Sequence, residues 1–248
     1  MLNWRDPVVT RIQTIPKRVG AALLHRAEAL ELQCRQDMLA LFDRNPAARL
    51  LDVGSADGAI TGMFAHRIGT RDVTAMDIVP ENIAACEARG YTGVTADITR
   101  PFPFPDNTFD VVTASHCIEH VADTDALLRE IQRVLRPGGY TVIATPNLAA
   151  WHHIGFLLLG FQPTIAEVSD EVLVGTLSPR GSDVGRLGPA HRRIFTPGAL
   201  KGLCEHHGLR VDRWIGSGFF PFSGNAARRL AALDRRHPTN ICLRATKR

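Results

Sequence analysis

Two groups of residues in this sequence have the types and the spacing that bind a nucleoside. An apolar stretch, residues 50–53, runs directly into a glycine turn at residues 54–58. Glycine lets a ligand approach the backbone, and a helix beginning there presents unpaired N–H groups. Asp77 follows a second apolar stretch, and a carboxylate at that place accepts hydrogen bonds from both ribose hydroxyls. Together these features predict a site for a nucleoside-containing cofactor.

The glycine turn also narrows the choice of cofactor. A dinucleotide fingerprint needs glycine at three positions that are here Gly54, Ala56 and Ala59, so a dehydrogenase is disfavoured. A phosphate-binding loop would need Gly-Lys-Ser or Gly-Lys-Thr, which the sequence lacks. Asp57 would repel a pyrophosphate but is compatible with a cationic ligand without phosphate. S-adenosyl-L-methionine (SAM) has that chemistry.

A third group of residues has the chemistry of proton transfer. His116 and His120 flank Glu119 just after an apolar stretch at residues 109–114. Histidine titrates near neutral pH and suits a general base, so His120 and His116 are the candidate catalytic residues. The alternative is packing or hydrogen bonding in the loop. The same segment fits an inverted zinc-protease pattern, but that pattern requires a helix where this segment leaves a strand.

Alternating apolar stretches and helical patterns predict an α/β fold with a mostly parallel sheet covered on both faces. The strands are expected at residues 49–53, 72–76, 91–96, 109–114, 140–144, 209–215 and 241–245. The helices are expected at residues 18–42, 58–68, from Pro80 onward, 124–135 and 197–207. The sequence Arg-Pro-Gly-Gly at residues 136–139 is expected to end a helix before a strand.

We expect one domain over residues 1–248, made of four segments. They are an N-terminal helical segment (1–48), a cofactor-binding core (49–147), a substrate cap (148–195) and a C-terminal completion of the sheet (196–248). Aromatic side chains offer the cap an apolar wall, and arginines can clamp an anionic group. The expected substrate-binding residues are Asn147, Trp151, His191, Arg192 and Phe195; ordinary packing and a solvated loop are the alternatives.

At this point the chain resembles the class I SAM-dependent methyltransferases. Five segments carry the resemblance, in order: residues 52–58, 76–78, 96–98, 109–121 and 135–139. It implies a Rossmann-like seven-stranded sheet with helices on both faces, SAM as cofactor and S-adenosylhomocysteine as product. It also implies that Asp77 binds the ribose and Asp97 the adenine. The full cofactor-binding set expected is Asp52, Gly54, Ser55, Ala56, Gly58, Asp77, Ile78, Asp97, Ile98 and Ser115.

A second resemblance concerns a metal. The small-RNA 2′-O-methyltransferases, which are similar here, hold a metal with Glu-x-x-Glu-His and a distant histidine. In this chain His116 replaces the first acid, and His191 is a candidate for the distant ligand. Because of that departure, and because no RNA-binding module accompanies it, we expect no metal.

The expected activity is methyl transfer to a small molecule, most simply to a hydroxyl oxygen, in glycan or secondary-metabolite chemistry. One alternative is an RNA methyltransferase using the basic C-terminal region, where residues 201–248 hold ten Lys and Arg against three acids. Another is a SAM-binding protein without catalysis. With no apolar run long enough for a bilayer and five scattered cysteines, we expect a cytoplasmic protein, with a homodimer possible through residues 18–42.

Overall fold

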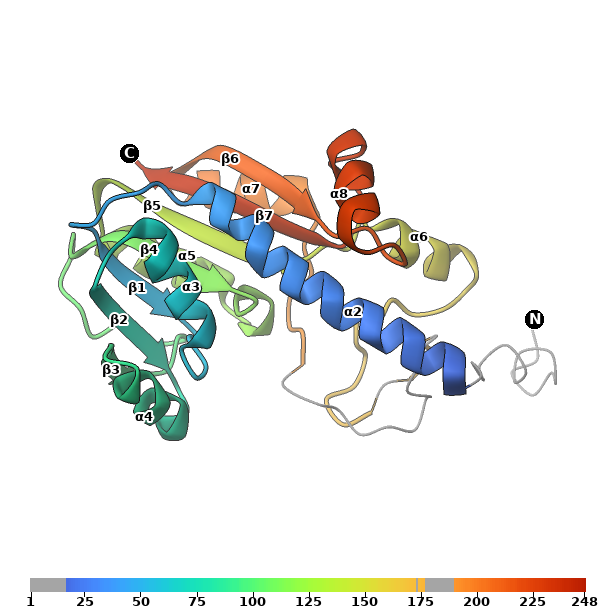
Figure 1. The fold of residues 1–248 in the computed structure, drawn as a ribbon, viewed down its shortest axis with the longest axis horizontal. Coiled ribbons are helices and arrows are strands. Elements are labelled where there is room, and N and C mark those ends of the chain that lie inside the picture. The colour runs from blue at the N-terminus through green and yellow to red at the C-terminus, as the bar shows by residue number, and fades with distance from the viewer. Residues whose placement is uncertain (1–16, 173, 177–189) are drawn as a thin grey trace.

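The chain folds around one seven-stranded sheet, seen in a computed structural model that describes residues 17–172, 174–176 and 190–248. The strand order is β3-β2-β1-β4-β5-β7-β6, and only β7 is antiparallel to its neighbours (Figure 1). The strands are β1 (Arg49–Val53), β2 (Asp72–Asp77), β3 (Thr92–Thr95), β4 (Phe109–Ser115), β5 (Leu135–Pro146), β6 (Leu209–Ser217) and β7 (Asn240–Lys247). The expected Rossmann-like α/β fold is thereby confirmed.

Helices cover both faces of this sheet because each sheet face is apolar. The helices are α2 (Lys17–Met38), α3 (Ala59–Ile68), α4 (Pro80–Ala88), α5 (Thr124–Val134), α6 (Trp151–Leu158), α7 (Pro197–His206) and α8 (Gly224–Leu233), with short 3-10 turns η1 (Leu39–Leu41) and η2 (Ile118–His120). α2 and α3 pack into one apolar core, and α5 and α7 pack into the other. Among the described residues, no helix combines the length and apolar character that a membrane span requires.

The parallel arrangement of β1, β2 and β4 decides where a ligand can bind. β1 lies between β2 and β4 and runs parallel to both, with Leu51 in register with Thr74 and with Val112. Their carboxyl ends therefore meet at one edge of the sheet, where the strand order changes direction. Open α/β sheets bind their ligands at such an edge.

Three parts of the chain differ from the sequence-based expectation. β5 begins at Leu135 rather than Tyr140, because Leu135 already pairs with Phe109 of β4, before an irregular stretch in which Gly138 has a φ of +78°. α8 was not predicted, although it buries Ala227 and Ala231 on one face and exposes Arg228 and Arg229 on the other. The cap contains α6 near its start, while residues 173 and 177–189 of the cap and residues 1–16 lie outside the described residues.

The N-terminal helix is part of the sheet's covering rather than an appendage. Cys34, Met38 and Phe42 are fully buried against the face of the sheet that α3 also covers. Ser115, at the end of β4, has its hydroxyl 3.6 Å from the Met38 sulfur. The C-terminal half of α2 therefore lies beside the edge where β4 ends, and it brings Cys34 close to the candidate site.

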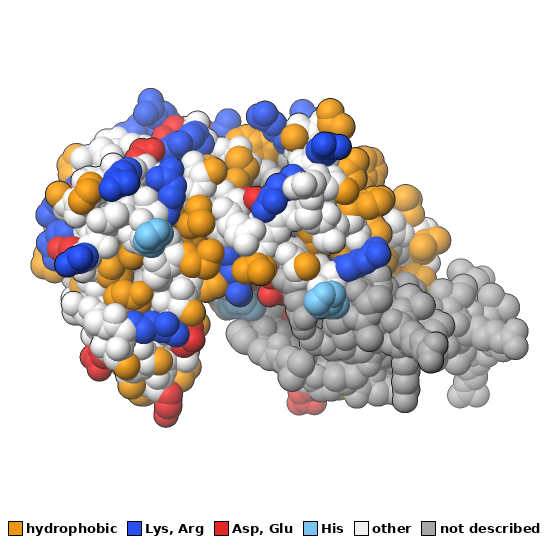
Figure 2. Space-filling model, viewed as in Figure 1, with side chains coloured by type: hydrophobic (Ala, Val, Ile, Leu, Met, Phe, Trp, Pro, Cys, Tyr) orange, Lys and Arg blue, Asp and Glu red, His pale blue; other side chains and the backbone are white. Residues whose placement is uncertain are grey.

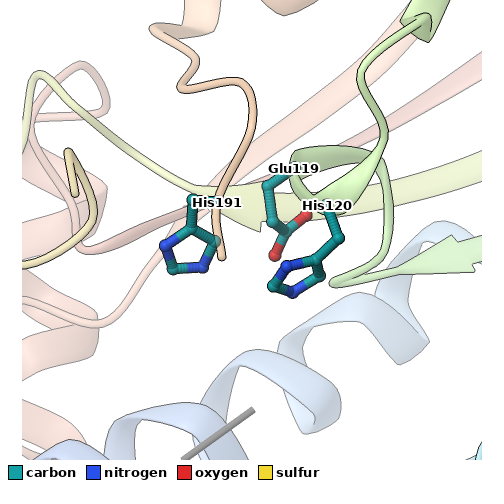
Figure 3. A group of neighbouring side chains, drawn as sticks. All are labelled: Glu119, His120 and His191. Carbon is teal, nitrogen blue, oxygen red and sulfur yellow. The ribbon is translucent and has the colours of Figure 1, made fainter. Parts of the chain in front are cut away.

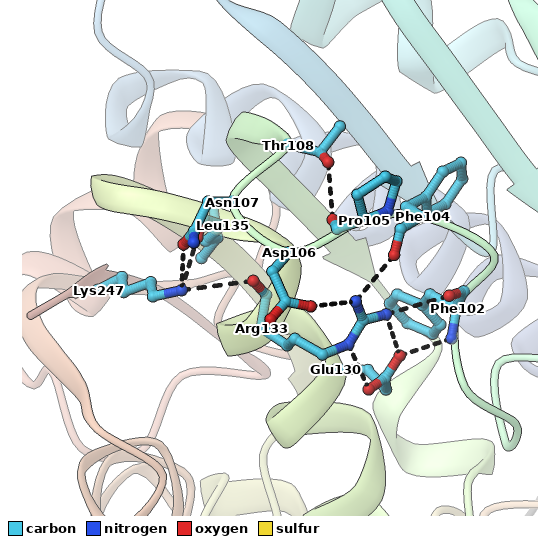
Figure 4. Close-up of polar contacts among 10 residues, drawn as sticks. All are labelled: Phe102, Phe104, Pro105, Asp106, Asn107, Thr108, Glu130, Arg133, Leu135 and Lys247. Carbon is cyan, nitrogen blue, oxygen red and sulfur yellow. Dashed lines mark hydrogen bonds and ion pairs between the residues drawn. The ribbon is translucent and has the colours of Figure 1, made fainter.

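An arginine network fixes the proline-rich loop between β3 and β4 (Figure 4). The Arg133 guanidinium donates to both carboxylate oxygens of Glu130, at 2.9 and 2.7 Å, and to Asp106 at 2.7 Å. It also donates to the backbone carbonyl oxygens of Phe104 and Phe102, at 2.8 and 3.0 Å. Prolines remove backbone donors from this loop, so the side chain of Arg133 supplies the hydrogen bonds that hold it.

Replacing Arg133 with methionine tests this network. Arg133→Met keeps an apolar stem of similar length but removes the donor from two carbonyl oxygens and leaves Glu130 with the Phe102 N–H in place of the guanidinium. We expect the free energy of unfolding to fall by about 2–4 kcal/mol. Urea denaturation followed by circular dichroism measures it. The control is Lys201→Met, which breaks an exposed pair with Glu205 and is expected to cost under about 0.5 kcal/mol.

Candidate functional site

The glycine turn after β1 has the backbone geometry that the sequence predicted. Gly54, Ala56 and Gly58 have φ values of +72°, +47° and +76°, and the two glycines adopt this left-handed conformation without strain. The Gly54 N–H donates to the Met76 carbonyl at 2.8 Å, which ties the turn to β2. A Cβ added to Gly54 would lie 3.0 Å from the Cys117 Cβ, so the position has no room for a side chain.

Asp77, the last residue of β2, connects this turn with the next one. Its carboxylate accepts hydrogen bonds from the Ala56 N–H and the Val79 N–H, each at 2.9 Å, and from the Asn82 side chain at 3.2 Å. Oδ1 accepts two of these bonds and Oδ2 accepts one, so Oδ2 has a further lone pair for an additional donor. The geometry therefore leaves Asp77 able to accept from a hydroxyl group placed over the turn.

Asp52 lies beneath the turn rather than on its surface. Its side chain is buried and accepts hydrogen bonds from the hydroxyls of Thr61 and Thr113. Burial raises the pKa of Asp52 to about 6, although the two hydroxyl donors oppose that shift. Ser55 is also buried, with its hydroxyl 3.7 Å from the Cys86 sulfur. Both side chains support the turn from inside, and cofactor contact by them stays a prediction.

The residues expected around an adenine base lie along the ends of β2 and β3. Ile78 directly follows Asp77, and its apolar side chain is 61% exposed. Asp97 accepts from the N–H and the hydroxyl of Thr99, at 2.8 and 2.7 Å, and these bonds lower the pKa of its carboxyl group. Ile98 is half-buried beside it. An exposed apolar surface next to a carboxylate fits the face and the amino edge of a base.

His116 is held at both ring nitrogens, which changes its expected role. Nε2 lies 3.6 Å from the Cys34 sulfur, and Nδ1 lies 3.4 Å from the Glu119 carboxylate. Burial by itself lowers the pKa of His116, but the contacts with Cys34 and Glu119 outweigh burial and raise it. A histidine that is already protonated and bonded on both sides is poorly suited to take a proton. The geometry therefore favours His120 over His116 as a base.

Cys34 is a residue that sequence reasoning missed. Its sulfur lies 3.4 Å from the Cys242 sulfur as well as beside His116, and these contacts lower the pKa of Cys34 despite burial. Cys34 comes from α2 and lies 82 positions before His116 in the sequence. No local pattern signals such a contact, because packing of α2 on the sheet creates it.

Glu119, His120 and His191 form a cluster at the end of β4 (Figure 3). Each offers one ligand atom, and these atoms all lie within 4.8 Å of one another. Burial opposes ionisation of Glu119, but the hydrogen bond and charge of His116 outweigh it and lower the pKa of this carboxyl group. The rings of His120 and His191 are stacked with centroids 5.0 Å apart. The structure thus brings a predicted catalytic residue beside a predicted substrate-binding residue.

Backbone hydrogen bonds position His191 within this cluster. The Glu119 carbonyl accepts from the Arg192 N–H at 2.6 Å and from the Arg193 N–H at 3.0 Å. The Phe195 carbonyl accepts from the Leu148 N–H at 2.8 Å, which anchors the same segment at its other end. Residues 190–195 therefore return to the end of β4 although they lie 70 positions from His120 in the sequence.

The other expected substrate-binding side chains are engaged elsewhere. Asn147 is buried and its amide donates to the carbonyls of Arg236 and Pro238, at 3.0 and 2.8 Å. Trp151 donates to Asp234 at 2.7 Å. Arg192 pairs with Asp170 at 3.2 Å, and Phe195 lies in the apolar core. These contacts give each residue a structural explanation, and their substrate roles stay predictions.

Comparison with known proteins agrees with this geometry. Residues 51–143 match a protein family described as "Methyltransferase domain", and these residues include the glycine turn, Asp77, Asp97 and His120. The matched residues are the ones on which the resemblance to the class I SAM-dependent methyltransferases rests. Members of this family use SAM, which is the cofactor that the sequence predicted.

The individual relatives define how far the similarity extends. "Ubiquinone/menaquinone biosynthesis C-methyltransferase UbiE" from Shewanella sp. (strain ANA-3) is 32% identical over 106 residues, which is 40% of this chain and 42% of that protein. The chain thus matches about two fifths of the length of its curated relatives.

Solved structures show the same fold over most of the chain. One is a Haloferax volcanii complex between the Trm112 methyltransferase activator and a methyltransferase, with a TM-score of 0.60, 15% identity, and coverage of 94% of this chain and 99% of that one. A SAM-dependent methyltransferase from Mesorhizobium loti gives a TM-score of 0.58 at 19% identity, covering 86% of this chain and 96% of that one.

The start of α6 generates a prediction about acid stability. Burial lowers the pKa of His152 to about 4 and that of His153 to about 3. In the unfolded chain histidine titrates near 6.5, so below that pH the unfolded state takes up protons first. The free energy of unfolding therefore decreases as the pH falls below 6.5, by at most about 1.4 kcal/mol per histidine per pH unit. Thermal unfolding measured from pH 7.5 to 5 should show the decline.

The matched variants for this measurement are His153→Leu and His66→Gln. His153 is buried, so the leucine variant should lose less stability on acidification than the unmodified protein. His66 is exposed, so its variant should follow the unmodified protein. If all three proteins lost equal stability on acidification, burial of His153 would not be a cause of the acid sensitivity.

Proposed function

We propose that this protein transfers the methyl group of SAM to an oxygen of a small-molecule acceptor. The observation that carries the proposal is the arrangement at one edge of the sheet. The glycine turn follows β1 and Asp77 ends β2, while Glu119 and His120 lie in η2, just after the neighbouring β4. A nucleoside held by the first pair would have its reactive end directed toward the second.

The residues present fit this cofactor. The left-handed turn at Gly54 has no side chain to obstruct a ligand, Oδ2 of Asp77 has a lone pair for a ribose hydroxyl, and Ile78 exposes an apolar surface to a base. Asp57 adds a negative charge beside the turn, although Arg89 pairs with it at 3.3 Å. When bound, SAM supplies a methyl group on a positively charged sulfur and leaves as neutral S-adenosylhomocysteine.

His120 supplies the proton acceptor in this proposal. Its Nδ1 lies 3.0 Å from the Ala190 carbonyl oxygen, which can only accept, so Nδ1 carries the hydrogen and Nε2 has the lone pair. That lone pair takes the proton that an acceptor hydroxyl loses as its oxygen bonds to the methyl group. Holding the acceptor in line with the sulfonium supplies much of the remaining acceleration.

The relatives agree with a small-molecule acceptor, and the substrate cap gives it a place. The curated relatives are named for C-methylation in ubiquinone and menaquinone biosynthesis. Deprotonating a ring hydroxyl makes both the oxygen and the adjacent ring carbons nucleophilic, so the same base serves either outcome. Residues 148–195 are proposed as the substrate cap, with residues 190–195 reaching the end of β4.

An RNA acceptor has less support from the surface. Figure 2 shows Lys and Arg side chains scattered over one face, with apolar and acidic side chains between them. Several of the C-terminal arginines are paired, since Arg213 and Arg244 both contact Asp43, and Arg228 contacts Asp37. Paired arginines contribute less to phosphate binding than a continuous basic stripe does.

The cofactor site is tested by Asp77→Asn. The variant replaces a charged acceptor, so we expect SAM and S-adenosylhomocysteine to bind about tenfold or more weakly. Isothermal titration calorimetry measures the Kd, with circular dichroism to verify the fold. The control is Asp72→Asn, at the exposed start of the same strand, which should bind like the unmodified protein. Unchanged affinity in a folded Asp77→Asn protein would overturn the cofactor assignment.

The base is tested by His120→Gln once labelled methyl transfer has identified an acceptor. Loss of a general base should lower kcat by about 10²–10⁴-fold while the Kd for SAM stays within a factor of two or so. His116→Gln serves as the comparison, because His116 is bonded at both nitrogens. Full turnover by the His120 variant would remove His120 from the mechanism.

A further inference from the structure

We propose that Glu119, His120 and His191 form a binding site for one divalent transition-metal ion. This reverses the expectation of no metal drawn from the sequence, and it rests on three features of the cluster. The first is the Nε2 lone pair of His120, which the hydrogen bond at Nδ1 leaves available. The second is the buried Glu119 carboxylate, which neighbouring side chains orient. The third is the segment 190–195, which backbone hydrogen bonds hold beside Glu119.

The tautomer of His120 is the one that a metal ligand needs. Metal-binding histidines commonly donate the hydrogen of one ring nitrogen to a carbonyl or carboxylate, which leaves the other nitrogen to bind the ion. Here Nδ1 donates to the Ala190 carbonyl at 3.0 Å and Nε2 has the lone pair. The carbonyl that fixes this tautomer belongs to Ala190, the residue before His191, so this hydrogen bond also holds the His191 backbone near His120.

The Glu119 carboxylate is oriented before any ligand arrives. Oε2 accepts from the Thr145 hydroxyl at 3.0 Å, and Oε1 lies 3.4 Å from His116. The side chain is 3% exposed, so it is buried at the floor of the cluster. Each oxygen has a second lone pair, which means that the carboxylate can bind an ion without releasing either partner.

His191 is the third ligand and comes from the return segment. The two hydrogen bonds from residues 192 and 193 to the Glu119 carbonyl place its backbone beside the carboxylate. The Glu167 carboxylate accepts from the His191 N–H at 2.8 Å and lies 3.8 Å from Nδ1. Both imidazoles are half-buried, and the ligand atoms lie within 4.8 Å of one another, compared with the roughly 3–3.5 Å that one bound ion requires; binding would close this gap while His120 keeps its hydrogen bond to Ala190.

The ligand set predicts which ions bind. Two imidazole nitrogens and one carboxylate suit Zn²⁺, Co²⁺, Mn²⁺ or Fe²⁺, whereas Mg²⁺ prefers oxygen ligands only. His116 stands where a second acid would favour Mg²⁺, and both its nitrogens already have partners. We therefore expect the affinity for Zn²⁺ and Co²⁺ to exceed that for Mg²⁺.

Three protein ligands leave coordination positions open, as in catalytic zinc sites. An ion here would bind the acceptor oxygen and lower its pKa, and this role rests on the proposed methyl transfer. The Nε2 lone pair of His120 then binds the ion and cannot also accept the proton. His120 therefore acts as a base only in the metal-free protein. The binding site itself does not depend on methyl transfer.

The experiment titrates the metal-free full-length chain with Co²⁺ and Zn²⁺ in the absence of SAM. Visible absorption of bound Co²⁺ and its displacement by Zn²⁺ report the site, and calorimetry gives the stoichiometry. We expect one ion per chain. A separate SAM titration on the same preparation distinguishes the two proposals, because SAM binding without metal binding overturns only this one.

Four variants locate the ion. Glu119→Gln and His191→Asn should abolish the Co²⁺ spectrum; His191 lies outside the helices and strands, and circular dichroism verifies that both variants fold. Thr145→Val removes only the hydroxyl that orients Glu119 and should weaken binding about 10–100-fold. The exposed His66→Gln is the control and should bind as the unmodified protein does. The inference is overturned if no ion binds, or if His191→Asn binds as tightly as the control.

Discussion

The parallel pairing of β1 with both β2 and β4 is the constraint on which the rest of the molecule depends. It places the ends of three strands at one edge, so that Gly54, Asp77 and Ser115 become neighbours although they are distant in sequence. Hydrogen bonds from the glycine turn to Met76 and Asp77 then fix that edge. Every functional proposal for this chain concerns groups at that edge.

Two segments outside the sheet complete the edge from opposite sides. The end of α2 brings Cys34 against His116, which occupies both nitrogens of that ring. The segment 190–195 brings His191 against Glu119 through backbone hydrogen bonds. The two histidines of one short loop thus have different surroundings: one is enclosed by charge partners, and the other has a lone pair for a proton or an ion.

Much of this architecture could be predicted from the sequence, because periodicity and glycine placement are local signals. All seven strands and the turn at Gly54 lie where the pattern put them, with β5 beginning earlier than expected. What escaped prediction depends on tertiary packing. Asn147 and Trp151 follow β5, yet their hydrogen bonds go to residues 234–238, a segment whose position no local pattern reveals. Likewise, His191 lies beside His120 because residues 190–195 fold back to the end of β4.

The placement of β7 has a consequence for biosynthesis. This strand is the last in the sequence but lies between β5 and β6, and it pairs with both over most of its length. During synthesis from the N-terminus, β1 to β5 can assemble first, whereas β6 has no place in the sheet until β7 emerges. The nascent chain therefore exposes one edge of β5 until residues 240–247 have been synthesised, and that edge is a natural target for a chaperone.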